Sequence, residues 1–354
     1  MKLGIIGLPQ TGKTTIFNAL TRGNQPVTTS GGRFEVHTAV VDVPDWRVDR
    51  LVELFKPKKK VYAKVTYADI AGLEGGKTSL PGALLNLLSQ MDGLVHVVRC
   101  FENPAVPHPA GSINPARDIA TMDAELLLND MILVERKLER LAEERKKGGG
   151  RDKAVIEREQ DLFERFHQAL SSETPLREVQ ITPEEEKLLA GFGFLTRKPL
   201  LLLFNLAEGQ QPPEADFTRP HVGVAALQGK LEMELAQLPP EDAALFMAEY
   251  GIQELGLNRV IRLSYEIMGL QSFFTVGPEE VHAWTVPRGI TAHEAAGQVH
   301  SDLQRGFIRA EVISCEELLA LGGLAEARKK GKLRIEGKDY VVKDCDIVHI
   351  LFNV

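Results

Sequence analysis

Short apolar runs alternate with longer amphipathic stretches along most of the chain. Runs of strand length are found at residues 2–6, 61–70, 94–101, 201–205 and 221–227. Several are followed by segments that repeat apolar residues at helical spacing. Strand-like runs alternating with helical stretches predict an α/β fold.

A heptad pattern occupies the middle of the chain. The run "KKGGGRD" interrupts it, and the pattern resumes afterwards. Two heptad segments joined by glycines predict an antiparallel coiled-coil hairpin with a glycine tip. The sequence leaves open whether this hairpin docks onto a partner or is a helical arm without one. The apolar positions are Leu127, Met131, Val134, Leu138 and Leu141, then Ile156, Phe163, Phe166 and Leu170.

The last part of the chain, residues 271–354, has the pattern of a small α/β unit of β-grasp size. One helix-like stretch, "TAHEAAGQVHSDLQRGF", lies among strand-like runs reading "SFFTV", "HAWTV", "AEVIS", "YVVKD" and "IVHILF". The first two runs form a predicted hairpin whose exposed edge is a candidate surface for RNA or protein. We expect Phe274 and Trp284 to lie in the core of this unit.

Composition and charge narrow the class of protein. A chain of 354 residues predicts two or three domains, and a net charge of -7 argues against wholesale wrapping by nucleic acid or an anionic membrane surface. No DNA specificity is evident. Three widely spaced cysteines fit neither a disulfide framework nor a zinc site, which favours a reducing cytoplasm. The sequence predicts neither a secretory leader nor a transmembrane segment.

A phosphate-binding pattern follows the first strand directly. "GLPQTGKT" satisfies Gly-x-x-x-x-Gly-Lys-Thr with Gly7, Gly12, Lys13 and Thr14, between a strand and a helix as the mechanism requires. The glycines let backbone amides turn inward, and the helix N-terminus adds its positive dipole. We expect Lys13 to reach the β- and γ-phosphates. The predicted nucleotide-binding residues here are Leu8, Pro9, Gln10, Thr11, Gly12, Lys13, Thr14 and Thr15.

A second pattern, Asp-x-x-Gly, ends the run at residues 61–72. In P-loop proteins such an aspartate holds magnesium and the glycine amide meets the γ-phosphate. We therefore predict Thr14 and Asp69 as metal ligands and Gly72 as a nucleotide contact. Leu73 stands where Ras-type enzymes carry a water-orienting glutamine, so hydrolysis must be slow, differently assisted or absent.

The base-reading segment departs from the guanine pattern. "LLLFNLAEG" places Asn205, Leu206 and Glu208 where a GTP-binding domain has Asn-Lys-x-Asp. Glu208 is one methylene longer than the aspartate that accepts two hydrogen bonds from guanine, so guanine specificity is doubtful and adenine becomes a candidate. The backbone of Ala225 and Ala226, in the next strand and loop, is a further candidate contact with the base.

Several long motifs together resemble the YchF group, the Obg-like ATPases. They include "GLPQTGKTTIFNALT", "DIAGL", "HVVRCFENP", "FNLAE" and "PEDAALFMAEYGI", and the resemblance is strongest in the last ninety residues. It implies a Ras-like P-loop domain (1–122 and 196–270), a coiled-coil insertion (123–195) and a C-terminal TGS domain of β-grasp fold (271–354).

The same resemblance implies a function. It implies ATP preferred over GTP, magnesium, and association with ribosomes or translation-linked RNA. From its position in a loop alone, His108 is expected to be a surface residue. The resemblance implies instead that it is the family's catalytic loop histidine. With Lys13, His108 is the predicted catalytic residue.

The departures from the family lie in the two switches. Arg33 stands where the first switch has a threonine, with Thr28, Thr29 and Thr38 nearby, and the run after Leu73 is shorter. One hypothesis is an ATP-hydrolysing molecular switch. The alternatives are a nucleotide-responsive ribosome- or RNA-binding protein with little hydrolysis, and a GTP-binding relative. The sequence leaves the partner, the ratio of ATP to GTP affinity and the oligomeric state undetermined.

Overall fold

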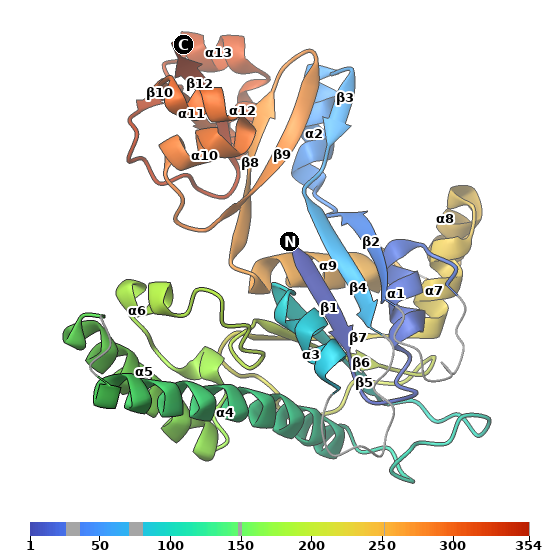
Figure 1. The fold of residues 1–354 in the computed structure, drawn as a ribbon. Coiled ribbons are helices and arrows are strands. Elements are labelled where there is room, and N and C mark those ends of the chain that lie inside the picture. Colours follow the sequence, from blue (N-terminus) through green and yellow to red (C-terminus); the bar gives the residue numbers. More distant parts are fainter. Residues whose placement is uncertain (26–35, 71–80, 148–150, 251, 354) are drawn as a thin grey trace. The chain divides into compact units, whose positions relative to one another are not determined.

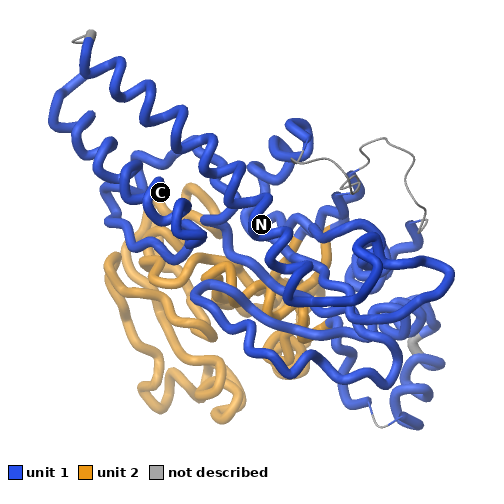
Figure 2. Tube along the Cα trace, turned by 90° about the horizontal axis from the view of Figure 1, so that it is seen from below, with its two compact units in different colours: residues 1–39, 66–257 blue, residues 40–65, 258–354 orange. Residues whose placement is uncertain are grey.

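The chain divides into two compact units (Figure 2). Unit 1 consists of residues 1–39 and 66–257, and unit 2 of residues 40–65 and 258–354. A computed structural model describes residues 1–25, 36–70, 81–147, 151–250 and 252–353.

Unit 1 is built on a six-stranded sheet whose order is β2-β4-β1-β5-β6-β7 (Figure 1). The pairs β4–β1, β1–β5, β5–β6 and β6–β7 are parallel. Every residue of β5 and of β6 is buried, as expected for central strands covered on both faces. The strands are β1 (Lys2–Ile6), β2 (Val36–Asp42), β4 (Lys64–Ile70), β5 (Gly93–Arg99), β6 (Leu200–Asn205) and β7 (Val222–Leu227).

Helices cover this sheet and bring the ends of its strands into one place. A buried apolar cluster joins the sheet to α3 and the first turns of α4, with Ile6, Leu84, Leu94, Met122 and Leu202 among its members. Since carboxyl ends of parallel strands share one edge, the segments after β1, β5 and β6 meet there. The helices of this unit outside the central insertion are α1 (Lys13–Thr21), α3 (Gly82–Ser89), α7 (Gly229–Gln237) and α8 (Pro240–Glu249), and α9 (Gly256–Ile267) belongs mostly to unit 2.

A helical hairpin interrupts unit 1 between β5 and β6. The two long helices α4 (Pro115–Lys147) and α5 (Lys153–Ser171) pack against each other, as the heptad pattern predicts (Figure 1). Val134, Phe163 and Phe166 are fully buried in their shared core. The glycines predicted at the tip, residues 148–150, lie outside the described residues. A 3-10 turn (Leu176–Glu178) and α6 (Pro183–Leu188) follow.

Unit 2 contains a second six-stranded sheet, in the order β11-β10-β12-β8-β9-β3. The pairs β8–β9 and β10–β12 are antiparallel, whereas β12–β8 and β3–β9 are parallel. Its strands are β3 (Lys59–Val61), β8 (Leu270–Val276), β9 (Glu280–Pro287), β10 (Phe307–Ser314), β11 (Arg334–Glu336) and β12 (Asp346–Phe352). Its helices are α2 (Trp46–Phe55), α10 (Ala292–Val299), α11 (Ser301–Arg305), α12 (Cys315–Leu321) and α13 (Leu324–Lys329).

Two details of unit 2 differ from the sequence-based expectation. Residues 40–65 and 258–270, both expected in the nucleotide domain, group with the C-terminal sheet. For the first segment the reason is that β3 pairs with β9 over Lys59–Glu280 to Val61–His282. The strand expected at 340–344 is wrong: only Val341 forms a single bridge, with Thr291. Phe274 is fully buried, and Trp284 packs against the core as expected. Across the described ranges, the structure contains no helix with the length and apolarity that a membrane span needs.

Candidate nucleotide-binding site

The loop between β1 and α1 has the backbone of an anion-binding nest. Gly7, Gln10 and Gly12 have φ values of 153°, 62° and 88°. A Cβ on Gly7 would lie 2.5 Å from the carbonyl oxygen of Val97, so only glycine fits there. In the structure described, α1 begins without a side-chain cap and without an acidic residue in its first turn. Its N-terminal amides therefore remain available to an anion.

Lys13 lies directly over this loop. Its Nζ donates to the carbonyl oxygens of Gly7 and Leu8, at 3.0 and 2.9 Å. Burial lowers the pKa of Lys13 to about 8, although the neighbouring Asp69 acts in the opposite direction. A phosphate anion placed here restores the counter-charge that the buried ammonium lacks, and raises this pKa again.

Thr14 and Asp69, the two predicted metal ligands, lie together. The Thr14 hydroxyl donates to Asp69 Oδ2 at 2.8 Å. Asp69 is 1% exposed and its Oδ1 is buried without a hydrogen-bond partner among the described residues. Burial raises the pKa of Asp69, opposed by the hydrogen bond from Thr14 and the charges of Lys13 and His37.

This pair fits magnesium. Mg²⁺ prefers oxygen ligands and takes few of them from the protein, leaving the rest to water and phosphate. An orphaned carboxylate oxygen beside a hydroxyl offers such a partial set. Across the described ranges, no cluster of three or more His, Cys, Asp or Glu side chains suits a metal ion.

Asn205 joins the phosphate loop to the start of α7. Its Nδ2 donates to the Thr11 carbonyl at 3.0 Å, and its Oδ1 accepts from the Gly229 amide at 3.2 Å. The side chain is buried, and a Cβ on Gly12 or Gly229 would lie 2.3 or 2.5 Å from its amide atoms. Asn205, predicted to contact the base, is therefore already engaged in holding the site together.

The other predicted base-reading residues are placed differently from one another. Leu206 is 6% exposed and belongs to the core cluster beneath the sheet. Glu208 is exposed on the turn after β6. Ala225 and Ala226 lie within β7, paired with β6, and the loop after that strand starts only at Gln228. Glu208 is thus the member of the set whose side chain is exposed.

His108 lies in the loop between β5 and α4 and is 9% exposed. Its Nδ1 accepts from the Ala110 amide at 3.1 Å, which leaves Nε2 to donate to Asp118 Oδ2 at 2.9 Å. Arg117 binds the other oxygen of Asp118 at 2.8 Å. The start of α4 fixes these residues, since Pro115 is its first residue and the Asn114 side chain caps the Arg117 amide. Both ring nitrogens of His108 therefore have a hydrogen-bond partner.

Two polar residues of this site were missed by sequence reasoning. Asp118 orients His108 from the first turn of α4, which begins at Pro115, before the helical insertion predicted from residue 123. The available signal was Asn114-Pro115, a pair typical of a helix start. Arg99 ends the apolar strand β5 and contacts both loops beside it. A charged residue at the end of an otherwise apolar run was the available signal. Gly72 and Leu73, with Thr28, Thr29 and Arg33, lie outside the described residues.

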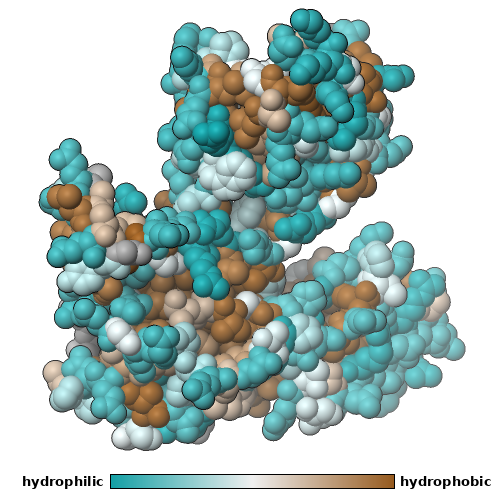
Figure 3. All heavy atoms as spheres, turned by 180° about the vertical axis from the view of Figure 1, so that it is seen from behind, coloured by the Kyte–Doolittle hydropathy of each residue, from teal (hydrophilic) through white to brown (hydrophobic). Residues whose placement is uncertain are grey.

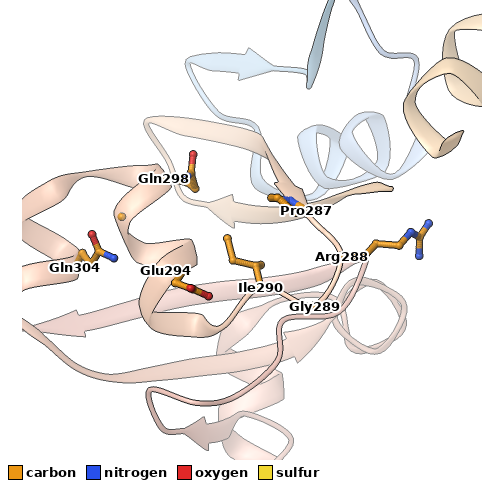
Figure 4. Close-up of a pocket in the computed structure, with 8 residues that line it drawn as sticks. Pro287, Arg288, Gly289, Ile290, Glu294, Gln298 and Gln304 are labelled. Atoms are coloured by element: carbon orange, nitrogen blue, oxygen red, sulfur yellow. The ribbon is translucent and has the colours of Figure 1, made fainter. Parts of the chain in front are cut away.

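A separate hollow is found in unit 2. It has a volume of about 500 Å³ and lies between the end of β9 and helices α10 and α11 (Figure 4). Arg288, Glu294, Gln298 and Gln304 give it a mixed lining, and it contains none of the predicted site residues. On the face shown in Figure 3, apolar residues gather in separate patches among hydrophilic ones.

The inward-turned loop, the buried lysine and the Thr14–Asp69 pair, set at one edge of a parallel sheet, define a P-loop nucleotide-binding protein of the Ras-like class. A family model described as a 50S ribosome-binding GTPase matches residues 2–137. A second, YchF-GTPase_C, described as a protein of unknown function (DUF933), matches residues 270–353. The chain belongs to the YchF family, which confirms the resemblance drawn from its motifs.

Relatives align over almost the whole chain. The ribosome-binding ATPase YchF of Bacillus subtilis (strain 168) is 39% identical over 370 residues, covering 99% of each chain. That of Escherichia coli O157:H7 is 39% identical over 371 residues, covering 100% of this chain and 99% of the relative. The solved structure of the Schizosaccharomyces pombe YchF GTPase matches with a TM-score of 0.84 and 29% identity, covering 99% of this chain and 97% of that one. The names differ on the nucleotide, ATP or GTP.

Proposed function

We propose that this chain is an ATP-binding and ATP-hydrolysing switch that acts on the ribosome in the cytoplasm. The observation that carries the proposal is the Lys13, Thr14 and Asp69 constellation in a chain related over its full length to proteins named ribosome-binding ATPase. Its proposed parts are the nucleotide domain (1–122 and 196–270), the hairpin insertion (123–195) and the TGS domain (271–354), although residues 40–65 and 258–270 group with the C-terminal sheet.

Binding of the triphosphate uses groups that the phosphate loop already presents. The backbone N–H groups of residues 8 and 10–15 donate to the β- and γ-phosphate oxygens, and Lys13 exchanges its two carbonyl partners for phosphate. Thr14 and Asp69 would hold magnesium, which supplies neutralising charge to the phosphates. Chemistry at such a site is mainly positioning and electrostatic stabilisation of the charge that develops during transfer.

Adenine is the proposed base. Glu208 is exposed after β6, but it is longer than the aspartate that pairs with guanine. Leu206 is buried in the core and offers no cation over the base plane. Base contacts are proposed for the segment that holds Asn205, Leu206 and Glu208, and for the backbone of Ala225 and Ala226. Gly72 is the proposed contact with the γ-phosphate. A GTP-binding relative is the second candidate, favoured by the name of the solved yeast structure.

Hydrolysis is proposed to use His108, placed by Asp118, to orient the attacking water. Both imidazole nitrogens are engaged, Nδ1 by the loop amide of Ala110 and Nε2 by Asp118 at the start of α4, so the ring has to release one partner before it can hold a water. This requirement also supports the alternative of a nucleotide-responsive ribosome- or RNA-binding protein with little turnover. Ribosomal RNA or protein is the proposed partner of the hairpin and the TGS domain.

A single-turnover ATPase assay tests the catalytic part of the proposal. Lys13→Ala is expected to lose turnover, because it removes the cation from the phosphate site. Lys198→Ala is the matched control: Lys198 also donates to two carbonyl oxygens in unit 1, those of Ser89 and Met91, and its pKa is also lowered by burial. Equal turnover in unaltered protein and Lys13→Ala would refute the enzymatic proposal. Co-sedimentation with ribosomes, with and without ATP, tests the partner.

A further inference from the structure

Arg99 is the largest fully buried side chain in the described structure. It is 1% exposed and lies at the end of β5, where its register partner on β6 is Asn205. Arginine is almost never fully buried without partners, because removing its charge from water is costly. Its position therefore requires an explanation in terms of its contacts.

The Arg99 guanidinium binds two separate loops. Nη1 donates to the carbonyl of Gln10 in the phosphate loop at 3.3 Å, and Nη2 donates to that of Val106 at 2.7 Å. Nε donates to the carbonyl of Phe101 at 3.0 Å. Val106 lies two residues before His108. One side chain thus connects the phosphate loop with the loop of the proposed catalytic histidine.

No carboxylate among the described residues forms an ion pair with Arg99. Its acceptors are backbone carbonyls, and the Phe101 ring lies beneath the guanidinium with 4.6 Å between ring centroid and Cζ. Burial lowers the pKa of Arg99, although a guanidinium remains protonated in proteins. An uncompensated positive charge bound to the phosphate loop adds to the favourable potential for an anion.

The contact with Gln10 falls where the phosphate loop needs support. Gln10 has a φ of 62°, in the left-handed region that is unfavourable for a residue with a side chain. The turn of Gln10 sets the direction of the following amides. Phe101 adds a second contact, since its ring lies 3.9 Å from where a Cβ on Gly12 would stand.

We propose that Arg99 is a positioning residue of the nucleotide site, which holds the phosphate loop at Gln10 and fixes the His108 loop relative to it. The inference rests on the proposed nucleotide binding and adds the residue that joins binding to hydrolysis. Arg99 does not touch the nucleotide in this proposal; it acts through the two loops.

Nucleotide titration of purified full-length variants tests this role. Arg99→Met keeps the apolar stem and removes all three hydrogen bonds, so we expect the ATP dissociation constant to rise at least about tenfold and kcat at saturating ATP to fall as well. Arg99→Lys keeps the charge, but one ammonium cannot span three carbonyls, so it is expected to lie between Arg99→Met and the unaltered protein. If Arg99→Met does not fold, Arg99→Lys decides.

Arg177→Met is the matched control. Arg177 is another buried arginine of unit 1, whose Nε donates to the Lys198 carbonyl at the other end of β6. Its replacement should lower stability and leave nucleotide affinity unchanged. Millimolar guanidinium chloride, far below the molar range that unfolds proteins, should restore affinity to Arg99→Ala but leave that of Arg177→Ala unchanged.

The outcomes separate this proposal from the proposed function. Nucleotide affinity and kcat of Arg99→Met within twofold of the unaltered protein would overturn the positioning role, with nucleotide binding itself intact. The same result for Arg99→Lys would overturn it if Arg99→Met does not fold. Failure of the unaltered protein to bind any nucleotide would overturn the proposed function and this inference with it. A tenfold loss confined to the Arg99 variants, with guanidinium rescue, supports the role.

Discussion

Replacing Gly229 with alanine gives the sharpest test of the bridge made by Asn205. Gly229 is the first residue of α7, and helix propensity alone predicts that alanine stabilises by about 1 kcal/mol. The structure predicts the opposite. A Cβ at this position would lie 2.5 Å from Asn205 Oδ1 and 2.7 Å from Ile16 Cδ1, both buried.

The magnitude follows from what has to move. Overpacking a filled core costs about 1–3 kcal/mol. Pushing Asn205 away also breaks its bond from the Gly229 amide, and an unsatisfied buried acceptor costs about 1–3 kcal/mol. After the propensity gain, we expect a net loss of about 3 kcal/mol, a large part of the roughly 5–15 kcal/mol that stabilises a typical domain. Because Asn205 also holds Thr11, nucleotide binding should weaken too.

Urea unfolding of unaltered and variant protein measures this loss, with the midpoints compared at unchanged m-value. The control is Gly82→Ala. Gly82 is likewise the first residue of a helix, α3, but nothing lies within 4 Å of an added Cβ. Gly82→Ala should be neutral or slightly stabilising. If Gly229→Ala were as stable as Gly82→Ala, the close packing around Asn205 would be wrong. The double variant Asn205→Ala, Gly229→Ala should lose less than the sum of the two singles.

Three further predictions concern the charged groups of the site. Burial lowers the pKa of Lys13 to about 8, so its cost to folding is fully present below pH 8 and is relieved as the pH rises toward 10.5. Lys13→Met should therefore have a higher free energy of unfolding in urea than the unaltered protein at pH 7, and this difference should shrink between pH 8 and 10.5. A difference that stays constant with pH would argue against a buried ammonium. Burial raises the pKa of Asp69, so Asp69→Asn should be at least as stable as the unaltered protein at pH 7. Titration with and without magnesium should show that the nucleotide affinity of this variant no longer depends on the metal. If the affinity still depended on magnesium, Asp69 would be excluded as a ligand. His108→Ala should lower the rate of single-turnover hydrolysis at least about tenfold without changing the ATP dissociation constant. The control is His167→Ala, on the surface of α5, which should change neither quantity. An unchanged rate in His108→Ala would exclude this histidine from the mechanism.

The parts of the candidate site whose local geometry follows from the sequence are contiguous or lie at strand ends. The phosphate loop is one unbroken pattern between a strand and a helix, and the structure presents its amides accordingly. Asp69 follows from its place at the end of an alternating run, and parallel pairing of β4 with β1 brings it beside Thr14. Periodicity also predicted the hairpin, because the heptad seam is local in sequence.

The remaining features depend on contacts between distant segments. The side chain of Asn205 binds residues 194 positions before and 24 positions after it. The local motif therefore predicts a nucleotide contact, but it does not predict that Asn205 connects the phosphate loop with α7. The pairing of β3 with β9 joins residues more than two hundred positions apart, and neither strand's own pattern specifies a partner. The sequence places Arg99 only at the end of a strand, and its contacts with the phosphate loop and the His108 loop appear only in the structure.

Calorimetric titration of the protein with ATP and with GTP in the presence of magnesium tests the proposed nucleotide switch directly. We expect ATP to bind at least about tenfold more tightly than GTP, which corresponds to about 1.4 kcal/mol. We also expect binding to be lost in Lys13→Ala and kept in Lys198→Ala. Absence of binding, or GTP binding as tightly as ATP, would contradict the proposal.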